Sequence, residues 1–408
     1  MDNAVFRMTR RATILQPPAA RLSGRAIASL VFVTAASMVA QGFGRFTYPV
    51  LLDAINDGVL QSYTRAGLLG TTSLVAYLLG TAAVSVASTR VEPISLVKWG
   101  LTLSALGLGL LAVAPGFAML AVALFIAGLG GAGVWVPAPG IAATAVGPER
   151  SGLAIGLVGS GIGLGIVVAG PLTNLVRWLA DDEGAWRPVY VIEAAVALVV
   201  LLGVLTIVRL PKTGTNATKV ELSVLRSVPG WRWLVAAFAI FGVSYSLYFY
   251  FLVAQLRETG WSASASTYIF TIVGINSAVG GIAFGRLSDR YGRPRMMLVG
   301  FLLLAASPLL TLSGQPALVV AAAFSFGLCV AGTPTSIAGI VADNLEGRAF
   351  GAAFGLLTLV FGLAQVLGPP FAGVMAESTG SFAIPFLIAS VFALGGAGCA
   401  IALWKPPN

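Results

Sequence analysis

The chain has 408 residues, of which 57% are hydrophobic and only 10% are charged, and its mean hydropathy is +0.92. Soluble domains carry charge on about a quarter of their residues, so this composition excludes an ordinary soluble protein. The net charge of +9 could indicate binding to nucleic acid, but the basic residues cluster in short polar gaps between apolar segments. Such loops orient membrane helices, and we therefore expect no nucleic-acid partner.

A membrane-spanning helix needs roughly 20 mainly apolar residues, and the chain contains about twelve such segments. We place them near residues 26–55, 64–88, 94–114, 116–143, 151–178, 186–208, 231–257, 265–286, 295–313, 315–341, 349–376 and 382–404. With a cytoplasmic N-terminus, most of the 24 Lys and Arg residues fall on the cytoplasmic side, as the positive-inside rule requires. The sequence therefore predicts an all-helical, multi-pass protein of a plasma (bacterial-type inner) membrane, with both termini cytoplasmic.

Residues 1–24 form a basic, polar stretch that we expect to be a cytoplasmic tail. A basic start is also typical of a signal peptide, but the apolar segment that follows is longer than the roughly 7 to 15 residues of a signal-peptide core. We therefore expect this segment to be retained as the first span.

The first span carries a charged residue, Arg45, in an otherwise apolar helix. Thr34, Gln41, Arg45 and Tyr48 recur at helical spacing and are predicted to share one polar face. A cation at membrane depth is costly unless it meets a partner or a watery cavity.

Two interpretations of Arg45 stay open at this point. Its guanidinium group could bind the anionic group of a substrate through paired hydrogen bonds. It could equally reach to the outer surface, or pair with Asp53 or Asp57 as a structural clamp.

The sequence leaves energy coupling open. Proton relays in membranes use Asp, Glu or His, and the chain has no His. Glu193 is a carboxylate well inside a span, and it is predicted either to fill a helix interface or to carry a coupling proton. Asp53, near Asp57, is the other candidate proton site, whereas exchange or facilitated diffusion needs neither residue.

Residues 209–229 form a polar stretch that we predict to be a cytoplasmic linker between two six-helix halves, residues 25–208 and 230–404, followed by a short cytoplasmic tail at 405–408. Glycines and prolines of the two halves coincide at an offset of about 200 residues, which is the mark of an internal repeat. Paired repeats facing a central site are typical of secondary transporters.

The stretch from Gly285 to Arg295 places five charged residues between two apolar segments. It resembles the signature loop of the major facilitator superfamily, with matches at Gly285, Asp289, Arg290, Gly292 and Arg293. The resemblance covers nearly the whole chain after Arg25 and implies twelve membrane helices in two pseudo-symmetric six-helix bundles. In that family the loop helps to hold one conformation of the transporter, and the alternative is that it only sets topology.

The corresponding loop of the first half departs from the signature, because Ser88 replaces the acidic residue and Val91 replaces the second glycine. We therefore expect the loop of the second half to dominate.

In the superfamily, the first helix of each three-helix repeat lines the central cavity. The resemblance therefore implies a substrate site formed by polar residues of both halves, each of which could alternatively hold helices together. The candidates are Arg45, Gln41, Tyr48, Tyr245, Tyr248, Asn276, Thr333 and Gln365.

The sequence thus predicts transport of a small organic solute, more readily an anion than a cation, by alternating access. The alternatives are export of neutral or drug-like compounds, indicated by aromatic residues such as Trp135, Phe249 and Tyr250, and a membrane sensor without transport. An enzyme is disfavoured because no His and no pair of carboxylates at membrane depth is available. We expect a monomer in the lipid bilayer without a cofactor or metal, with a coupling proton as an optional partner.

Overall fold

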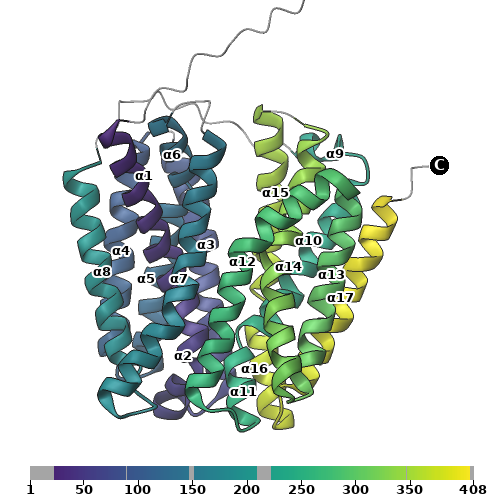
Figure 1. Cartoon of the computed structure of the whole chain (residues 1–408). Coiled ribbons are helices and arrows are strands. Elements are labelled where there is room, and N and C mark those ends of the chain that lie inside the picture. Colours follow the sequence, from purple (N-terminus) through teal and green to yellow (C-terminus); the bar gives the residue numbers. More distant parts are fainter. Residues whose placement is uncertain (1–22, 89, 147–150, 209–221, 346, 405–408) are drawn as a thin grey trace, which may run out of the picture.

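The computed structural model describes residues 23–88, 90–146, 151–208, 222–345 and 347–404. This part of the chain is helical between short turns and contains no strand (Figure 1). Twelve of its helical segments are long and apolar enough to cross a membrane, so the predicted all-helical membrane protein is confirmed. The N-terminal tail to residue 22, residues 209–221 of the linker and the C-terminal tail lie outside the described residues.

The first span is continuous from residue 24 to residue 60 and changes its helix type along its length. It consists of α1 (Gly24–Ser37), the π-helical η1 (Met38–Phe46), α2 (Thr47–Ile55) and the π-helical η2 (Asn56–Leu60). The other elements of the N-terminal half are α3 (Tyr63–Ala87), α4 (Pro93–Val113), α5 (Phe117–Trp135), α6 (Ala138–Val146), α7 (Ser151–Ala180) and α8 (Arg187–Thr206).

The remaining elements follow a short helix, α9 (Leu222–Arg226). They are α10 (Trp231–Phe249), α11 (Leu252–Glu258), α12 (Ala263–Tyr291), α13 (Arg293–Leu312), α14 (Pro316–Ala342), α15 (Gly347–Gln365), α16 (Gly368–Thr379) and α17 (Ala383–Trp404).

Local sequence explains where the spans begin and end. Ser62 and Ser262 are N-caps, and their side chains accept hydrogen bonds from backbone N–H groups in the first turns of α3 and α12, which satisfies donors that a helix leaves free. Gly292 separates α12 from α13 at a φ of 94°, a conformation that glycine adopts without steric cost. Pro294 then occupies the first turn of α13, where its missing N–H is not needed.

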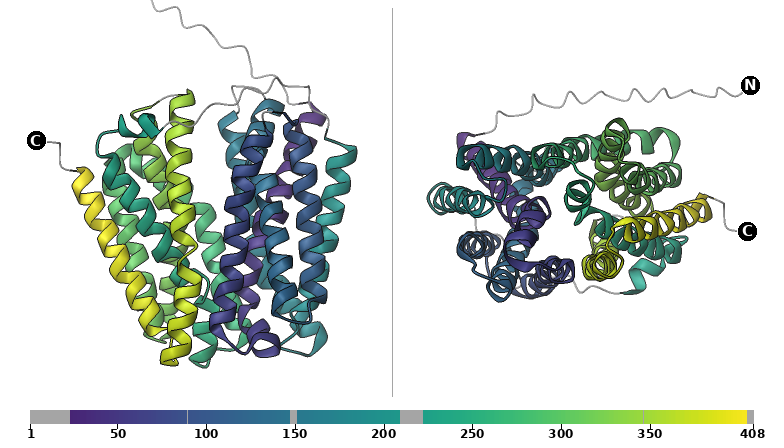
Figure 2. Two further views of the ribbon diagram at one scale, coloured as in Figure 1. Left: turned by 180° about the vertical axis from the view of Figure 1, so that it is seen from behind. Right: turned by 90° about the horizontal axis from the view of Figure 1, so that it is seen from below.

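The helices form two groups that lie side by side, α1 to α8 and α10 to α17 (Figures 1 and 2). We call the end of the molecule where α1 begins and α17 finishes the terminus end, and the other end, near α11 and α16, the opposite end. The two groups meet where α7 packs on α12 and where α3 packs on α16. Thr267 of α12 donates a hydrogen bond of 2.9 Å to the side-chain oxygen of Asn174 on α7.

Glycine lets the backbones of the two groups touch near the opposite end. A Cβ atom on Gly67 of α3 would collide with the backbone of Pro369 on α16, and one on Gly373 of α16 would collide with the backbone of Tyr63. Close approach of this kind needs small residues in membrane helices. The α3–α16 contact therefore closes the space between the groups at the opposite end.

Charged residues reinforce the same closure. Arg257 at the end of α11 forms ion pairs with Asp53 of α2 at 3.2 Å and with Glu183 of the α7–α8 loop at 3.0 Å. Nearby, the Glu377 carboxylate of α16 accepts hydrogen bonds of 2.8 Å from the Ser62 hydroxyl and from the backbone N–H of Thr64. Each of these contacts joins one group of helices to the other.

We expect Gly373→Val to open the molecule at the opposite end, because its larger side chain separates α16 from α3. The distance between spin labels at the exposed positions 61 and 378 should increase. Gly398→Val is the matched control, because a Cβ at Gly398 meets no atom within 4 Å. Equal label distances in both variants would contradict the role of the α3–α16 contact.

We expect Arg257→Ala to shift the same equilibrium less strongly. An ion pair near the surface contributes up to about 1 kcal/mol, so loss of the two Arg257 pairs should raise the population that is open at the opposite end by about thirtyfold at most. The same label pair measures this change, and a high-salt buffer should reproduce part of it in the wild type. A population insensitive to both changes would show that packing alone closes this end.

Candidate functional site

A cavity of about 580 Å³ lies between the two groups of helices. Its lining comes from η1, α3, α5, α6 and α7 on one side and from α10, α14 and α15 on the other. Helices α6 and α15, which contribute to this lining, lie toward the terminus end of the molecule (Figure 1). The cavity therefore lies in the half of the molecule away from the α3–α16 closure. A concave site with a few convergent polar groups is the usual form of a small-molecule site.

The π-helical segment η1 brings Gln41, Arg45 and Phe46 to the cavity wall. Such segments carry an extra residue per turn and occur frequently at functional sites. The backbone of η1 lies against α7, because a Cβ on Gly42 would come within 2.6 Å of the Cα of Gly165. This close packing fixes the height and rotation at which Arg45 enters the cavity.

Arg45 reaches across the cavity to the other group of helices. Its Nη2 donates a hydrogen bond of 2.5 Å to Oε1 of Gln365 on α15. The guanidinium carbon lies 5.3 Å from the ring centre of Tyr77 and 5.5 Å from that of Phe46, which is within the range of cation–π attraction. Tyr245 of α10 lines the same cavity.

The charge of Arg45 has no carboxylate partner among the described residues. Asp53, which the sequence offered as a clamp, pairs instead with Arg257. The Nε atom of Arg45 is buried and has no hydrogen-bond partner in the described structure. Among the described residues that line the cavity, Arg45 is the only one with a charged side chain. A buried, unpaired cation is costly, so the cavity favours an anion.

The structure brings four of the predicted substrate-binding residues together, because Gln41, Arg45, Tyr245 and Gln365 all line the cavity. The structure differs from the prediction at Tyr48, which does not line the cavity. The Tyr48 hydroxyl instead donates a hydrogen bond of 2.7 Å to the Ala66 carbonyl. One extra residue in a π turn rotates the following residues by about 100° relative to an α-helix. The predicted continuous polar face therefore ends after Arg45.

Three other candidates lie in helix contacts away from the cavity lining. Tyr248 shares a hydrogen bond of 2.6 Å with the Thr311 hydroxyl, and Asn276 donates to the Ile272 carbonyl of its own helix. Thr333 is fully buried where α14 presses against Gly300 of α13. Among these described hydrogen bonds, only that of Tyr248 joins two helices, α10 and α13.

Among the lining residues that sequence reasoning missed are two polar residues of α3, Tyr77 and Thr81. Their spacing of four residues places them on one face of a helix, and this was the available signal. It was weak because α3 also carries Thr and Ser on its other faces. Trp135 and Phe361 complete the aromatic part of the lining together with Phe46, Phe241 and Tyr245.

The signature loop lies at the terminus end, between α12 and α13. Arg293 pairs with Asp289 at 2.7 Å and with Asp343 at the end of α14 at 3.4 Å, while Arg290 lies over the ring of Tyr291 at 5.3 Å. Gly285 faces Thr335 of α14. In this conformation the loop ties α12 and α13 to α14, all within one group of helices, so its conformational role stays a prediction.

The two candidate proton sites lie outside the cavity. Glu193 of α8 is completely buried, and its Oε1 accepts a hydrogen bond of 2.6 Å from the Thr47 hydroxyl, while its Oε2 has no described partner. Asp53 belongs to the closure at the opposite end. Neither carboxylate lines the space that holds Arg45.

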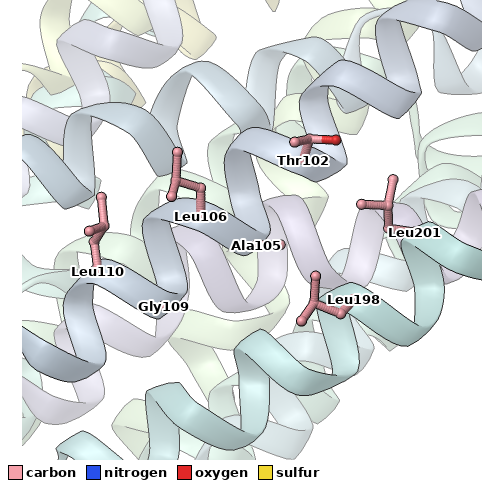
Figure 3. Close-up of a pocket in the computed structure, with 7 residues that line it drawn as sticks. All are labelled: Thr102, Ala105, Leu106, Gly109, Leu110, Leu198 and Leu201. Atoms are coloured by element: carbon pink, nitrogen blue, oxygen red, sulfur yellow. The ribbon is translucent and has the colours of Figure 1, made fainter.

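A second pocket lies between α4 and α8 and has a volume of about 350 Å³ (Figure 3). Its lining consists of Thr102, Ala105, Leu106, Gly109, Leu110, Leu198 and Leu201. The Thr102 hydroxyl donates to the Lys98 carbonyl of its own helix, and Leu106 and Leu198 are about half exposed. This aliphatic groove suits lipid chains and offers no group that would orient a polar solute.

Comparison with known proteins places this geometry in a family. A family model described as "Uncharacterised MFS-type transporter YbfB" matches residues 37–401. The chain belongs to this family. By its description, this is a family of major facilitator (MFS-type) transporters.

Curated relatives match over part of their length. Monocarboxylate transporter 13 of Bos taurus is 28% identical over 238 residues, which are 56% of this chain and 55% of that protein. The chain thus spans about half the length of the curated relatives it matches. The Probable actinorhodin transporter of Streptomyces coelicolor is 33% identical over 127 residues, or 31% of this chain and 22% of that protein.

Solved structures share the fold at low sequence identity. A bacterial homolog to the human lysosomal transporter Spinster has a TM-score of 0.76 and 18% identity, covering 93% of this chain and 97% of its own. The nucleoside transporter NupG has a TM-score of 0.75 and 13% identity, covering 94% of this chain and 100% of its own. These likenesses confirm the major facilitator fold.

We expect Glu193→Gln to fold and transport like the wild type, because a neutral amide can still accept the Thr47 hydrogen bond. Replacing a buried charge by a neutral group of similar volume is often neutral or stabilising. Thr47→Val should cost about 1 to 3 kcal/mol, since it leaves the carboxylate without its donor. Thermal unfolding in detergent measures both effects. If Glu193→Gln removed the dependence of transport on a proton gradient, Glu193 would be a coupling residue instead.

Proposed function

We propose that the protein transports a small organic anion by alternating access and that Arg45 holds the anionic group. The observation that carries this proposal is the Arg45 guanidinium group, which has no carboxylate partner among the described residues that line the cavity and whose Nε has no described hydrogen-bond partner. A carboxylate accepts two parallel hydrogen bonds from a guanidinium group. An anion would therefore satisfy both the charge and the open donor of Arg45.

The arrangement of the helices supports alternating access. The cavity lies toward the terminus end, and the contacts between α3 and α16 and between Arg257 and Asp53 close the opposite end. With cytoplasmic termini, as the basic residues predict, this is an inward-facing conformation of an inner-membrane protein. Breaking the closure and separating the groups at the opposite end would expose the same site to the other side.

The relatives add independent support for the substrate class. Monocarboxylate transporter 13 is, by its name, a carrier of organic anions, and its match covers more than half of this chain. The matched identity is low, so it supports an anionic solute and does not identify which one.

Export of neutral or drug-like compounds is the second candidate function. The observation that favours it is the large share of aromatic and aliphatic side chains in the cavity. The match to the Probable actinorhodin transporter is compatible with it. In this case Arg45 would stabilise the empty carrier through Gln365 and would not contact the solute.

We expect Arg45→Gln to weaken binding of the transported anion by about 10- to 100-fold, because a hydrogen bond to a charged group contributes about 1.5 to 3 kcal/mol. The measurement is uptake of labelled carboxylates into liposomes that contain the purified protein, together with the ligand-induced rise in melting temperature. Arg226→Gln is the control, because Arg226 is exposed on α9, outside the membrane helices. Transport of neutral compounds by Arg45→Gln at the wild-type rate, without any anion transport by the wild type, would favour export.

A further inference from the structure

The cavity can neutralise one negative charge. Arg45 contributes one positive charge to the described lining, which contains no Lys, Asp or Glu. A second carboxylate on the same solute would lie in the cavity without a counter-charge, which is costly. The site therefore selects against dianions.

The hydrogen-bonding groups around Arg45 are largely committed to the protein. Gln41 donates to the Gly131 carbonyl, the Thr81 hydroxyl to the Tyr77 carbonyl, and the Thr358 hydroxyl to the Phe354 carbonyl. With these three groups engaged, the described lining offers a solute mostly aromatic and aliphatic side chains. It therefore favours a solute that is mainly apolar beyond its anionic group.

One wall of the cavity is an aromatic platform on α10 and α15, formed by Phe241, Tyr245 and Phe361. The Phe241 and Tyr245 ring centres lie 5.9 Å apart with planes 15° apart, and those of Phe241 and Phe361 lie 5.8 Å apart with planes 30° apart. Phe238 stacks on Phe361 at 5.0 Å and Phe326 on Tyr245 at 6.0 Å. Tyr245 and Phe361 are 6.3 Å apart with planes 43° apart, so the three rings form one contiguous aromatic wall.

The other group of helices contributes Phe46, Tyr77 and Trp135 to the same lining. Tyr245 connects the two features, because it stacks on Phe241 and lines the same cavity as Arg45. A carboxylate held by Arg45 thus places the atoms attached to it next to the platform. Aromatic rings pack on one another with an attraction beyond simple burial of area.

The size of the cavity agrees with a ring-bearing solute. Its volume of about 580 Å³ lies in the range of sites that enclose drug-sized ligands. An acid of three carbon atoms would leave most of this space to water next to aromatic rings.

From these observations we infer that the substrate is a monoanion whose carboxylate is attached, directly or through a short link, to an aromatic body. This inference rests on the proposed function and narrows its substrate class. Arg45 selects the charge, and Phe241, Tyr245 and Phe361 select the shape.

The test is equilibrium binding to the purified full chain, by melting-temperature shift and competition at fixed ionic strength. The probes are lactate, cyclohexanecarboxylate, benzoate, 2-naphthoate, the dianion terephthalate and the neutral 2-naphthamide. We expect 2-naphthoate to bind at least tenfold more tightly than lactate and more tightly than cyclohexanecarboxylate. Terephthalate and 2-naphthamide should bind at least tenfold more weakly than 2-naphthoate.

Variants assign the preference to the platform. Phe361→Leu should weaken 2-naphthoate binding by about five- to tenfold and leave lactate binding unchanged, since it removes a ring and keeps an apolar side chain. Trp135→Leu tests the other wall in the same way and covers the case in which Phe361→Leu fails to fold. Phe324→Leu is the control, because Phe324 is exposed on the outer face of α14.

The outcomes separate the two proposals. Equal, Arg45-dependent binding of lactate and 2-naphthoate would overturn the aromatic preference and leave anion transport intact. Binding of 2-naphthamide as tight as that of 2-naphthoate, unchanged in Arg45→Gln, would overturn both in favour of export of neutral compounds. Failure of every monoanion to bind the wild type would also overturn the inference.

Discussion

A charged side chain inside the hydrocarbon layer is costly because no water is present to solvate it. The described arginine residues are placed in agreement with this constraint. Arg290 and Arg293 lie in a turn at the terminus end, and Arg257 meets the carboxylates of Asp53 and Glu183 at the opposite end. Arg45 alone enters the described cavity, where two aromatic rings and an amide oxygen surround it. The position of this cation organises the rest of the site.

Composition and periodicity were sufficient to predict the helical fold, because each span has to be long and apolar and each turn has to carry polar residues, Gly or Pro. Arg45 could be recognised for the same reason, since a cation in an apolar span has few structural uses. The expectation that the loop after α12 dominates over the loop after α3 stays a prediction, although Arg293 forms ion pairs there.

The remaining site residues depended on facts that the sequence does not contain. Tyr48 left the predicted face because a π-helical segment changes the rotation of the chain. The Tyr248 hydroxyl is engaged by Thr311 of the helix packed beside it, and the Asn276 amide is engaged by the Ile272 carbonyl of its own helix. A hydroxyl or amide satisfied in this way gives the same sequence signal as one that faces a cavity. Tyr77 was overlooked because its importance arises from Arg45, which is distant in the sequence and adjacent only in the fold.

The hydrogen bond between Arg45 and Gln365 joins the two groups of helices across the space that a solute must enter. A carboxylate that binds the guanidinium group competes with the Gln365 oxygen for the same donor. Substrate binding would then break the hydrogen bond between the two groups of helices. The vacant protein would resist reorientation, and the occupied protein would be free of that restraint. Such competition would limit futile cycling of the empty carrier without any further gate.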